Sequence, residues 1–96
     1  MTDLRKLAQG RECMVRMPGV CNGNTETTVL AHYRLMGISG MGLKVPDILG
    51  AWACAACHRA IDGFGRPRNI TKEAARLMHA EGVMRTQAAL IKEGEL

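Results

Sequence analysis

Four cysteines constrain the fold of this chain more than any other feature. They are Cys13, Cys21, Cys54 and Cys57, in the spacing C-x7-C-x32-C-x2-C. A CxxC pair lets two sulfurs converge on one tetrahedral ion, typically with the second cysteine in the first turn of a helix. Seven residues separate the first two cysteines, and a Pro-Gly turn among them can bring the two thiols together. The spacing therefore predicts a split four-cysteine zinc site that joins two distant segments of the chain.

The rest of the composition explains why such a site would be needed. The chain has 96 residues, which predicts one domain over residues 1–96, yet it has only three aromatic residues and eleven glycines. A domain this small gains limited stability from its core, and a metal or disulfide commonly supplements it. Residues 1–12 show no secretory signal pattern, and no apolar run approaches the length of a membrane span. We therefore expect a cytoplasmic chain with no membrane partner, whose reduced thiols bind metal.

Three other interpretations of the cysteines stay open at this point. The CxxC pair could be a redox centre, although no thioredoxin-like βαβ pattern surrounds it. The cysteines could be small buried residues without a ligand. His58 directly follows Cys57 and could replace one cysteine as a zinc ligand.

Hydrophobic and turn-forming patterns predict a small α+β fold with two short antiparallel strands and flanking helices. A first helix capped by Thr2 should run to about Gln9, because Gly10 follows it. Residues 13–24 are rich in turn formers and should form a knuckle. The expected elements after it are a strand over 27–35, a loop over 36–47, a strand over 48–53 and a helix over 54–62.

The C-terminal third is predicted to hold two helices. A basic loop over 63–69 should lead into a helix over 72–80, and Gly82 should separate it from a last helix over 84–93. The apolar residues of these helices are expected to pack inward; they are Leu77, Met78, Met84 and Ile91.

Two histidines and an aspartate suggest phosphodiester chemistry. His32 lies in the first predicted strand, and His58 and Asp62 lie four residues apart on one face of the helix that opens with CxxC. Strand with histidine, loop, strand and then this helix is the order of a ββα-metal nuclease. Phosphodiester cleavage needs a base for the water proton and a divalent cation for the developing charge. His32 is therefore the candidate general base, and His58 with Asp62 are candidate ligands for catalytic Mg, Mn, Ni or Zn.

Simpler interpretations compete with each of these roles. His58 and Asp62 could be an i,i+4 pair on an exposed helix surface. His32 could be a structural strand residue, and we expect a structural role for His79.

The net charge of +4 is compatible with a nucleic-acid partner, and nine of the thirteen basic residues are arginine, which suits phosphate contacts. The same charge could simply keep a small protein in solution. The candidate basic surface consists of Arg34, Lys44, Arg59, Arg66 and Arg68. Seven methionines also allow an adaptable apolar surface, and hence a protein partner or a homodimer.

Three segments carry a resemblance to a known family. CMVRMPGVCNGN, TTVLAHYRLMG and ILGAWACAACHRAIDG resemble the YbcO-like nucleases of lambdoid prophages, which are related to HNH endonucleases. The resemblance implies a treble-clef-like ββα-metal fold, a structural zinc and an endonuclease acting on DNA, with a place in phage recombination inside a bacterial host. It implies His32 as general base and His58 at the catalytic metal.

The chain departs from the HNH pattern at two positions. Many HNH enzymes have an acidic metal ligand just before the strand histidine, where this chain has Ala31. No asparagine occurs between Tyr33 and Cys57, so Asp47 is the nearest polar candidate for the middle position of the motif. Two non-catalytic functions therefore remain as alternatives: a zinc module that binds DNA or RNA, and a zinc-clamped domain that binds a protein through its C-terminal helices.

Overall fold

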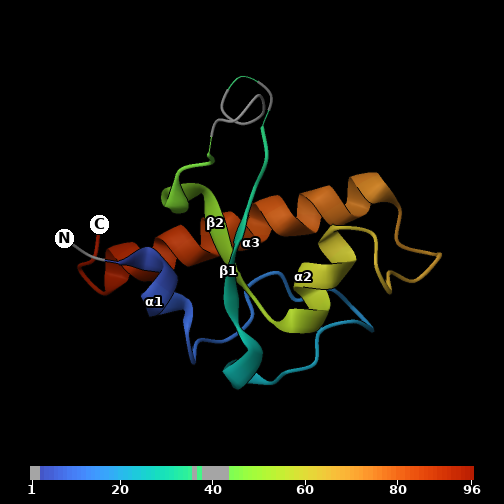
Figure 1. Ribbon diagram of the computed structural model, residues 1–96, viewed down its shortest axis with the longest axis horizontal. Coiled ribbons are helices and arrows are strands. Elements are labelled where there is room, and N and C mark those ends of the chain that lie inside the picture. Colours follow the sequence, from blue (N-terminus) through green and yellow to red (C-terminus); the bar gives the residue numbers. More distant parts are fainter. Residues whose placement is uncertain (1–2, 36, 38–43) are drawn as a thin grey trace.

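A two-stranded antiparallel sheet occupies the centre of the fold, and one long helix packs across it (Figure 1). The computed structural model describes residues 3–35, 37 and 44–96. In chain order its helices and strands are α1 (Leu4–Ala8), β1 (Val29–His32), β2 (Gly50–Ala53), α2 (Ala55–Ile61) and α3 (Lys72–Lys92), with 3₁₀ turns at Thr25–Thr27 and Asp47–Leu49. The small α+β fold with two antiparallel strands, as the sequence predicted, is confirmed.

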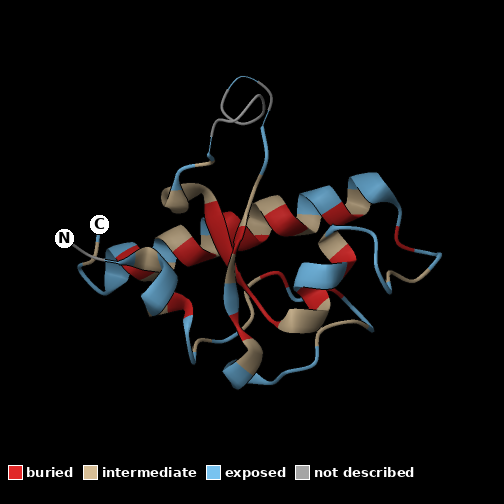
Figure 2. Cartoon of the chain, in the orientation of Figure 1, coloured by how far each residue is buried: buried red, intermediate tan, exposed pale blue. Residues whose placement is uncertain are grey.

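The strand β2 forms the middle of the core. All four of its residues are buried, and α3 covers the sheet with Ala75, Val83 and Leu90 turned inward (Figure 2). The backbone N–H of Trp52 donates to the hydroxyl of Thr86 at 2.9 Å, which ties the strand to the helix. Because both β2 and the inner face of α3 are fully covered, the sheet can present its other strand to a functional site.

Both strands are shorter than the sequence pattern suggests. Strands were expected over 27–35 and 48–53, but a 3₁₀ turn precedes each one. The reason is local hydrogen bonding before β1, where Asn24 caps the turn and the Thr27 hydroxyl donates to the Asn24 carbonyl at 2.9 Å. Polar side chains that bond their own backbone compete with a ladder in this way. Most of the loop expected at 36–47 lies outside the described residues.

The first helix begins one residue later than predicted. Asp3 is its cap, and its carboxylate accepts from the backbone N–H groups of Arg5 and Lys6 at 3.1 and 3.3 Å. Thr2, the expected cap, lies outside the described residues. After the helix, Arg11 pairs with Glu93 through both guanidinium nitrogens, at 2.5 and 2.7 Å, so the N-terminal segment is fastened to the end of α3.

The prediction of two C-terminal helices was wrong. Residues Lys72–Lys92 form one helix, and Gly82 lies inside it. A β-carbon at Gly82 would meet a methyl group of Val15 at 3.0 Å and the Met14 carbonyl at 3.1 Å. Gly82 is therefore the site where the knuckle backbone approaches α3, and this packing outweighs the roughly 1 kcal/mol that glycine costs in a helix.

The inward packing expected for these helices was also largely wrong. Leu77, Met84 and Ile91 are 61, 59 and 63% exposed, whereas Met78 is half-buried against the core. The single continuous helix explains the error, because its buried face carries small and polar residues such as Ala75, Gly82 and Thr86 instead.

Candidate functional site

The four cysteines meet where the knuckle touches the start of α2. Cys54 caps α2 and Cys57 lies in its first turn, while Cys13 and Cys21 come from the segment between α1 and β1. All four sulfur atoms lie within 4.8 Å of one another, and those of Cys21 and Cys54 are 3.9 Å apart. Tetrahedral zinc with Zn–S bonds of about 2.3 Å requires sulfur separations of about 3.8 Å. The donor set therefore fits zinc.

Backbone N–H groups support the sulfurs. Cys54 Sγ accepts from the backbone N–H of Asn22 at 3.5 Å and from that of Cys57 at 3.4 Å. Cys13 Sγ accepts from the N–H of Arg16 at 3.5 Å, and Arg16 has the positive φ of 52° that turns this N–H inward. Such donors favour thiolates, which are the metal-binding form of cysteine.

The thiols hold their protons unequally. The hydrogen bond from Cys57 lowers the pKa of Cys13 to about 4 and raises the pKa of Cys57 itself. Burial raises the pKa of Cys21. Four clustered cysteines can all ionise together only with a cation between them, because like charges at this distance repel. His58 is outside this cluster, so the four-cysteine set is the one that the fold brings together.

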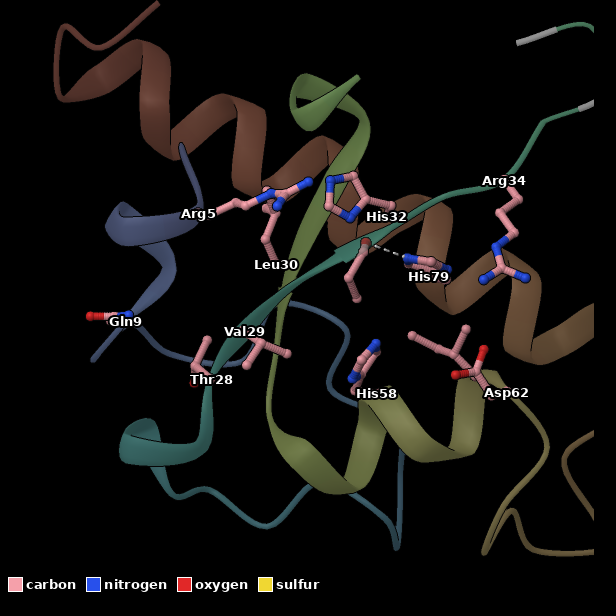
Figure 3. A pocket seen from close by; sticks show the side chains of 12 residues that line it. Arg5, Gln9, Thr28, Val29, Leu30, His32, Arg34, His58, Asp62 and His79 are labelled. Atoms are coloured by element: carbon pink, nitrogen blue, oxygen red, sulfur yellow. Dashed lines mark hydrogen bonds between the residues drawn. The ribbon is translucent and has the colours of Figure 1, made fainter. Parts of the chain in front are cut away.

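A second feature is an open cleft of about 490 Å³ beside β1 (Figure 3). Helix α1, strand β1, helix α2 and the buried side of α3 all contribute to its walls. In Figure 3, His58 and Asp62 extend from α2 toward β1, and Arg5 extends from α1 toward His32. The predicted residues that line the cleft are His32, Arg34, His58 and Asp62.

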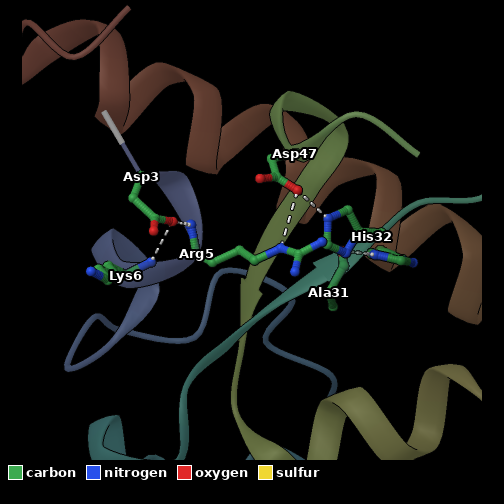
Figure 4. Close-up of polar contacts among 7 residues, drawn as sticks. Asp3, Arg5, Lys6, Ala31, His32 and Asp47 are labelled. Atoms are coloured by element: carbon green, nitrogen blue, oxygen red, sulfur yellow. Dashed lines mark hydrogen bonds and ion pairs between the residues drawn. The ribbon is translucent and has the colours of Figure 1, made fainter. Parts of the chain in front are cut away.

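His32 is held by a carboxylate. Its Nε2 lies 2.7 Å from Asp47 Oδ1, and the guanidinium Nε of Arg5 lies 3.4 Å from the same oxygen (Figure 4). The hydrogen bond with His32, aided by the charge of Arg5, lowers the pKa of Asp47. Asp47 therefore stays ionised and fixes the orientation of the His32 ring. The sequence offered Asp47 only as the nearest polar residue, and it gave no signal for Arg5.

His58 and Asp62 are both exposed at the cleft, one turn apart on α2. Among the residues that the structure describes, the four cysteines are the one group of three or more potential ligands whose donor atoms converge. His58 and Asp62 thus offer two ligands on an open surface, with the remaining positions left to water or substrate.

His79 lies behind the cleft. It is 4% exposed, its Nε2 lies 2.9 Å from the carbonyl oxygen of Ala31, and its ring packs against Tyr33 at a centroid distance of 5.0 Å. Burial lowers its pKa, so the ring is neutral. These contacts agree with the structural role expected for His79, and they also fasten the strand that carries His32 onto α3.

The basic residues divide between two surfaces. Arg34 lines the histidine cleft, and Lys44 is exposed at the start of the described range 44–96. Arg59 faces a different side of α2, where it lines a smaller hollow together with Phe64. Arg66 and Arg68 follow in the same loop, so the five residues do not form one continuous set.

Fold and site together define the class of protein: a small α+β domain with four cysteines close enough to hold one metal ion, beside a histidine-lined cleft. In the described part of the chain no helix is both long and apolar enough to cross a bilayer.

The chain belongs to the family described as "Putative nuclease YbcO", whose sequence profile matches residues 2–95. It is 53% identical over 94 residues to "Putative nuclease YbcO" of Escherichia coli K12, covering 98% of this chain and 96% of that protein, and equally to the protein of the same name from Enterobacteria phage 82. A solved structure described as a putative bacteriophage protein from E. coli K-12 superposes with a TM-score of 0.78 at 47% identity, over 96% of this chain and all of the other. The family expected from the sequence is thereby confirmed.

Proposed function

We propose that this protein is a metal-dependent endonuclease of the HNH type that hydrolyses phosphodiester bonds in DNA. One observation carries the proposal: His32, oriented by an ionised Asp47, shares an open cleft with His58 and Asp62. Base, candidate metal ligands and cationic side chains are the parts that phosphodiester cleavage requires. The nuclease descriptions of the relatives support the same class of reaction.

In this proposal His32 is the general base. Donation of its Nε2–H to Asp47 leaves Nδ1 as the nitrogen that accepts a proton from the attacking water. Asp47 is a positioning residue, since it holds the tautomer and ring orientation without reaching the reacting atoms. In the proposal, Asp47, from the turn before β2, takes the role of the missing asparagine.

His58 and Asp62 are the proposed ligands of the catalytic ion. A bound divalent cation would supply Lewis-acid stabilisation of the phosphorane charge and of the leaving oxygen. Arg34, and Arg5 from α1, line the same cleft and can place a phosphate against these residues by charge-assisted hydrogen bonds. Zinc at the four cysteines is separate from this chemistry and acts on folding.

The alternative is a zinc module that binds nucleic acid without cutting it. The sparse ligand set favours it, because among the described residues the proposed catalytic ion has only His58 and Asp62 as protein ligands, and position 31 has no carboxylate. That function predicts salt-sensitive binding with no metal-dependent cleavage.

Metal dependence is the test that separates the two functions. Zinc-loaded protein is incubated with plasmid and with branched DNA in buffer without added divalent ions, or with Mg, Mn or Ni, beside His58→Ala and Asp62→Asn. We expect nicking that needs an added ion, and we expect both variants to need higher ion concentrations or to lose activity. Cleavage that is the same with and without added ions would contradict the catalytic-metal proposal, and folded protein that binds but never nicks would support the alternative.

We also propose that two copies associate through α3. Leu77, Met84 and Ile91 are exposed and seven residues apart, so they form one apolar line along the helix. The line is symmetric about Met84, as an isologous two-fold contact requires, because Leu77 of one antiparallel helix would face Ile91 of the other. Three side chains cover less than the roughly 800 Å² per partner of a standard interface, so a weak dimer is expected.

Sedimentation equilibrium tests this association. Met84→Glu should remain monomeric at concentrations where the wild type dimerises, while Leu96→Glu, an exposed apolar site beyond the helix, should behave as the wild type. A wild type that stays monomeric at millimolar concentration would contradict the proposed dimer.

A further inference from the structure

Phe64 is a large aromatic residue that the fold leaves in solvent. It is 66% exposed, whereas Trp52 is 2% exposed and Tyr33 is partly buried against His79. Phe64 belongs to neither hydrophobic cluster of the core. Nothing in the described part of the chain requires an aromatic ring at this position for stability.

The backbone nevertheless holds Phe64 in a defined place. Its N–H donates to the Arg59 carbonyl at 2.9 Å, the N–H of Gly63 donates to the Ala60 carbonyl at 3.0 Å, and Gly63 has φ = 94°. This is a Schellman ending of α2, in which the residue at the Phe64 position normally packs against the helix residue five before it. Here that residue is Arg59, so an aromatic ring and a guanidinium group share this end of the helix.

The ring borders a hollow of about 200 Å³ between α2 and the cysteine knuckle. Gly19 and Val20 of the knuckle, Ala56 and Arg59 of α2, and Phe64 with Gly65 line it. Apart from the Phe64 ring and Arg59, the lining side chains are small, and polar atoms form the larger part of the exposed wall. The segment from Gly63 to Thr71 adds Arg66 and Arg68 and contains no acidic residue. An open hollow with an exposed ring, one arginine in its wall and two more arginines in the adjoining segment matches a base attached to a phosphate backbone.

We propose that Phe64 and this hollow form a stacking site for an unpaired nucleobase, with Arg59, Arg66 and Arg68 contacting the adjoining phosphates. The proposal rests on the proposed function and adds a class of substrate: DNA with unpaired nucleotides, either single-stranded or at a branch. A base inside a perfect duplex is stacked on its neighbours and cannot cover the ring. His58 and Arg59 are consecutive on α2 and face different sides of it, so a strand that leaves the histidine cleft has to bend around the helix to place a base on Phe64.

Equilibrium binding tests the site independently of cleavage. The probes are a fluorescein-labelled single strand, a perfect duplex of the same sequence and a duplex with a single-stranded tail, with zinc-loaded protein and no added catalytic metal. Stacking contributes about 1–3 kcal/mol per base, so Phe64→Ala should weaken binding to the single strand and the tailed duplex by roughly 5- to 150-fold. Its affinity for the perfect duplex should stay within about twofold.

Three controls sharpen this result. Phe64→Tyr keeps a ring and should retain affinity, and Leu96→Ala removes another exposed apolar side chain, beyond the end of α3, and should change nothing. Arg66→Ala and Arg68→Ala should reduce the salt dependence of binding, whereas Phe64→Ala should leave it unchanged. A single strand carrying 2-aminopurine should be quenched on binding to wild type and not to Phe64→Ala.

Several outcomes would overturn the stacking site. They are equal losses on the single strand and the perfect duplex, no loss on either, unchanged 2-aminopurine quenching in Phe64→Ala, or no binding by the wild type. A protein that binds through Phe64 but never nicks DNA would overturn the nuclease and leave the stacking site standing. A protein that nicks tailed and plain duplex equally, with or without Phe64, would overturn the stacking site and leave the nuclease standing.

Discussion

The cysteine cluster and the histidine cleft lie on the same short helix, yet they are built in opposite ways. Four sulfurs converge within 4.8 Å of one another; Cys54 and Cys57 are buried, Cys13 and Cys21 are half-buried, and backbone N–H groups support the sulfurs. At the cleft, His58 and Asp62 stand on an exposed face, and His32 is held by Asp47. Four ligands complete the shell of a tetrahedral ion, whereas two ligands leave coordination positions for substrate. The difference is the one expected if the cysteine cluster stabilises the fold and the histidine cleft performs the proposed chemistry.

Removing a cysteine should have the largest effect of any single change. Cys57→Ser deletes a buried ligand, and since structural zinc contributes folding energy directly, we expect loss of zinc and of the cooperative melting transition. Zinc content by mass spectrometry and thermal melting measure both. Ala55→Ser, between the two cysteines of the pair, should keep zinc and melt almost as the wild type does. One bound zinc and an unchanged melting curve in Cys57→Ser would mean that zinc at the cysteine cluster does not stabilise the fold.

Removing the carboxylate that holds His32 should lower the cleavage rate and leave the cysteine cluster and its zinc intact. Asp47→Asn removes the charge that orients the ring, so we expect nicking to fall by roughly 10- to 100-fold, less than the 10²–10⁴-fold typical of losing a general base. Zinc content and melting should match the wild type. Glu26→Gln, at an exposed carboxylate in another turn, is the matched control. If zinc content fell along with the rate, the two regions would not be independent.

A smaller effect is expected where the knuckle meets α3. Gly82→Ala would place a β-carbon 3.0 Å from a methyl group of Val15 and 3.1 Å from the Met14 carbonyl oxygen, so the knuckle has to give way by a few tenths of an ångström. We expect a loss of about 1–3 kcal/mol, typical of overpacking, despite the gain in helix propensity. Urea unfolding measures it, and Ala88→Gly on the exposed face gives the propensity term alone. Stabilisation by Gly82→Ala would show that the knuckle does not press on the helix.

The smallest effect concerns pH and His79. Burial lowers the pKa of His79 in the folded chain, whereas the unfolded chain takes up the proton near pH 6.5. Below that pH the unfolded state binds more protons than the folded state. The stabilisation by neutral His79 is therefore complete above about pH 6.5, and it is lost as the pH drops toward the folded pKa. Unfolding free energies at pH 7.5 and 5.5 should differ more in wild type than in His79→Gln. Zinc release acts on both proteins, so equal differences would contradict the neutral, buried His79.

The sequence predicted the closed region better than the open one. Spacing within a pair is a local property, so C-x7-C and CxxC each predicted two converging thiols, and the four ligands of tetrahedral zinc joined the two pairs. Short apolar runs located both strands, and Cys54 with Gly63 bounded α2. Asp47 and Arg5 could not be assigned in this way, because their contact with His32 depends on how α1 and the turn before β2 pack around the sheet.

The errors share a physical cause as well. Gly82 indicated a helix break because glycine has low helix propensity, but the knuckle backbone occupies the space where a side chain would be. Leu77, Met84 and Ile91 indicated a core face because they are apolar, but small residues on the other face let α3 lie close to β2. Both outcomes depend on tertiary packing, which local patterns do not contain.

The most direct test of the account is the metal-dependent nicking rate of His32→Ala beside wild type, at matched zinc content and matched melting temperature. If His32 is the general base, we expect a folded, zinc-loaded variant whose nicking rate is roughly 10²–10⁴-fold lower, the usual contribution of such a base. An undiminished rate in that variant would contradict the assignment of the chemistry to the histidine cleft.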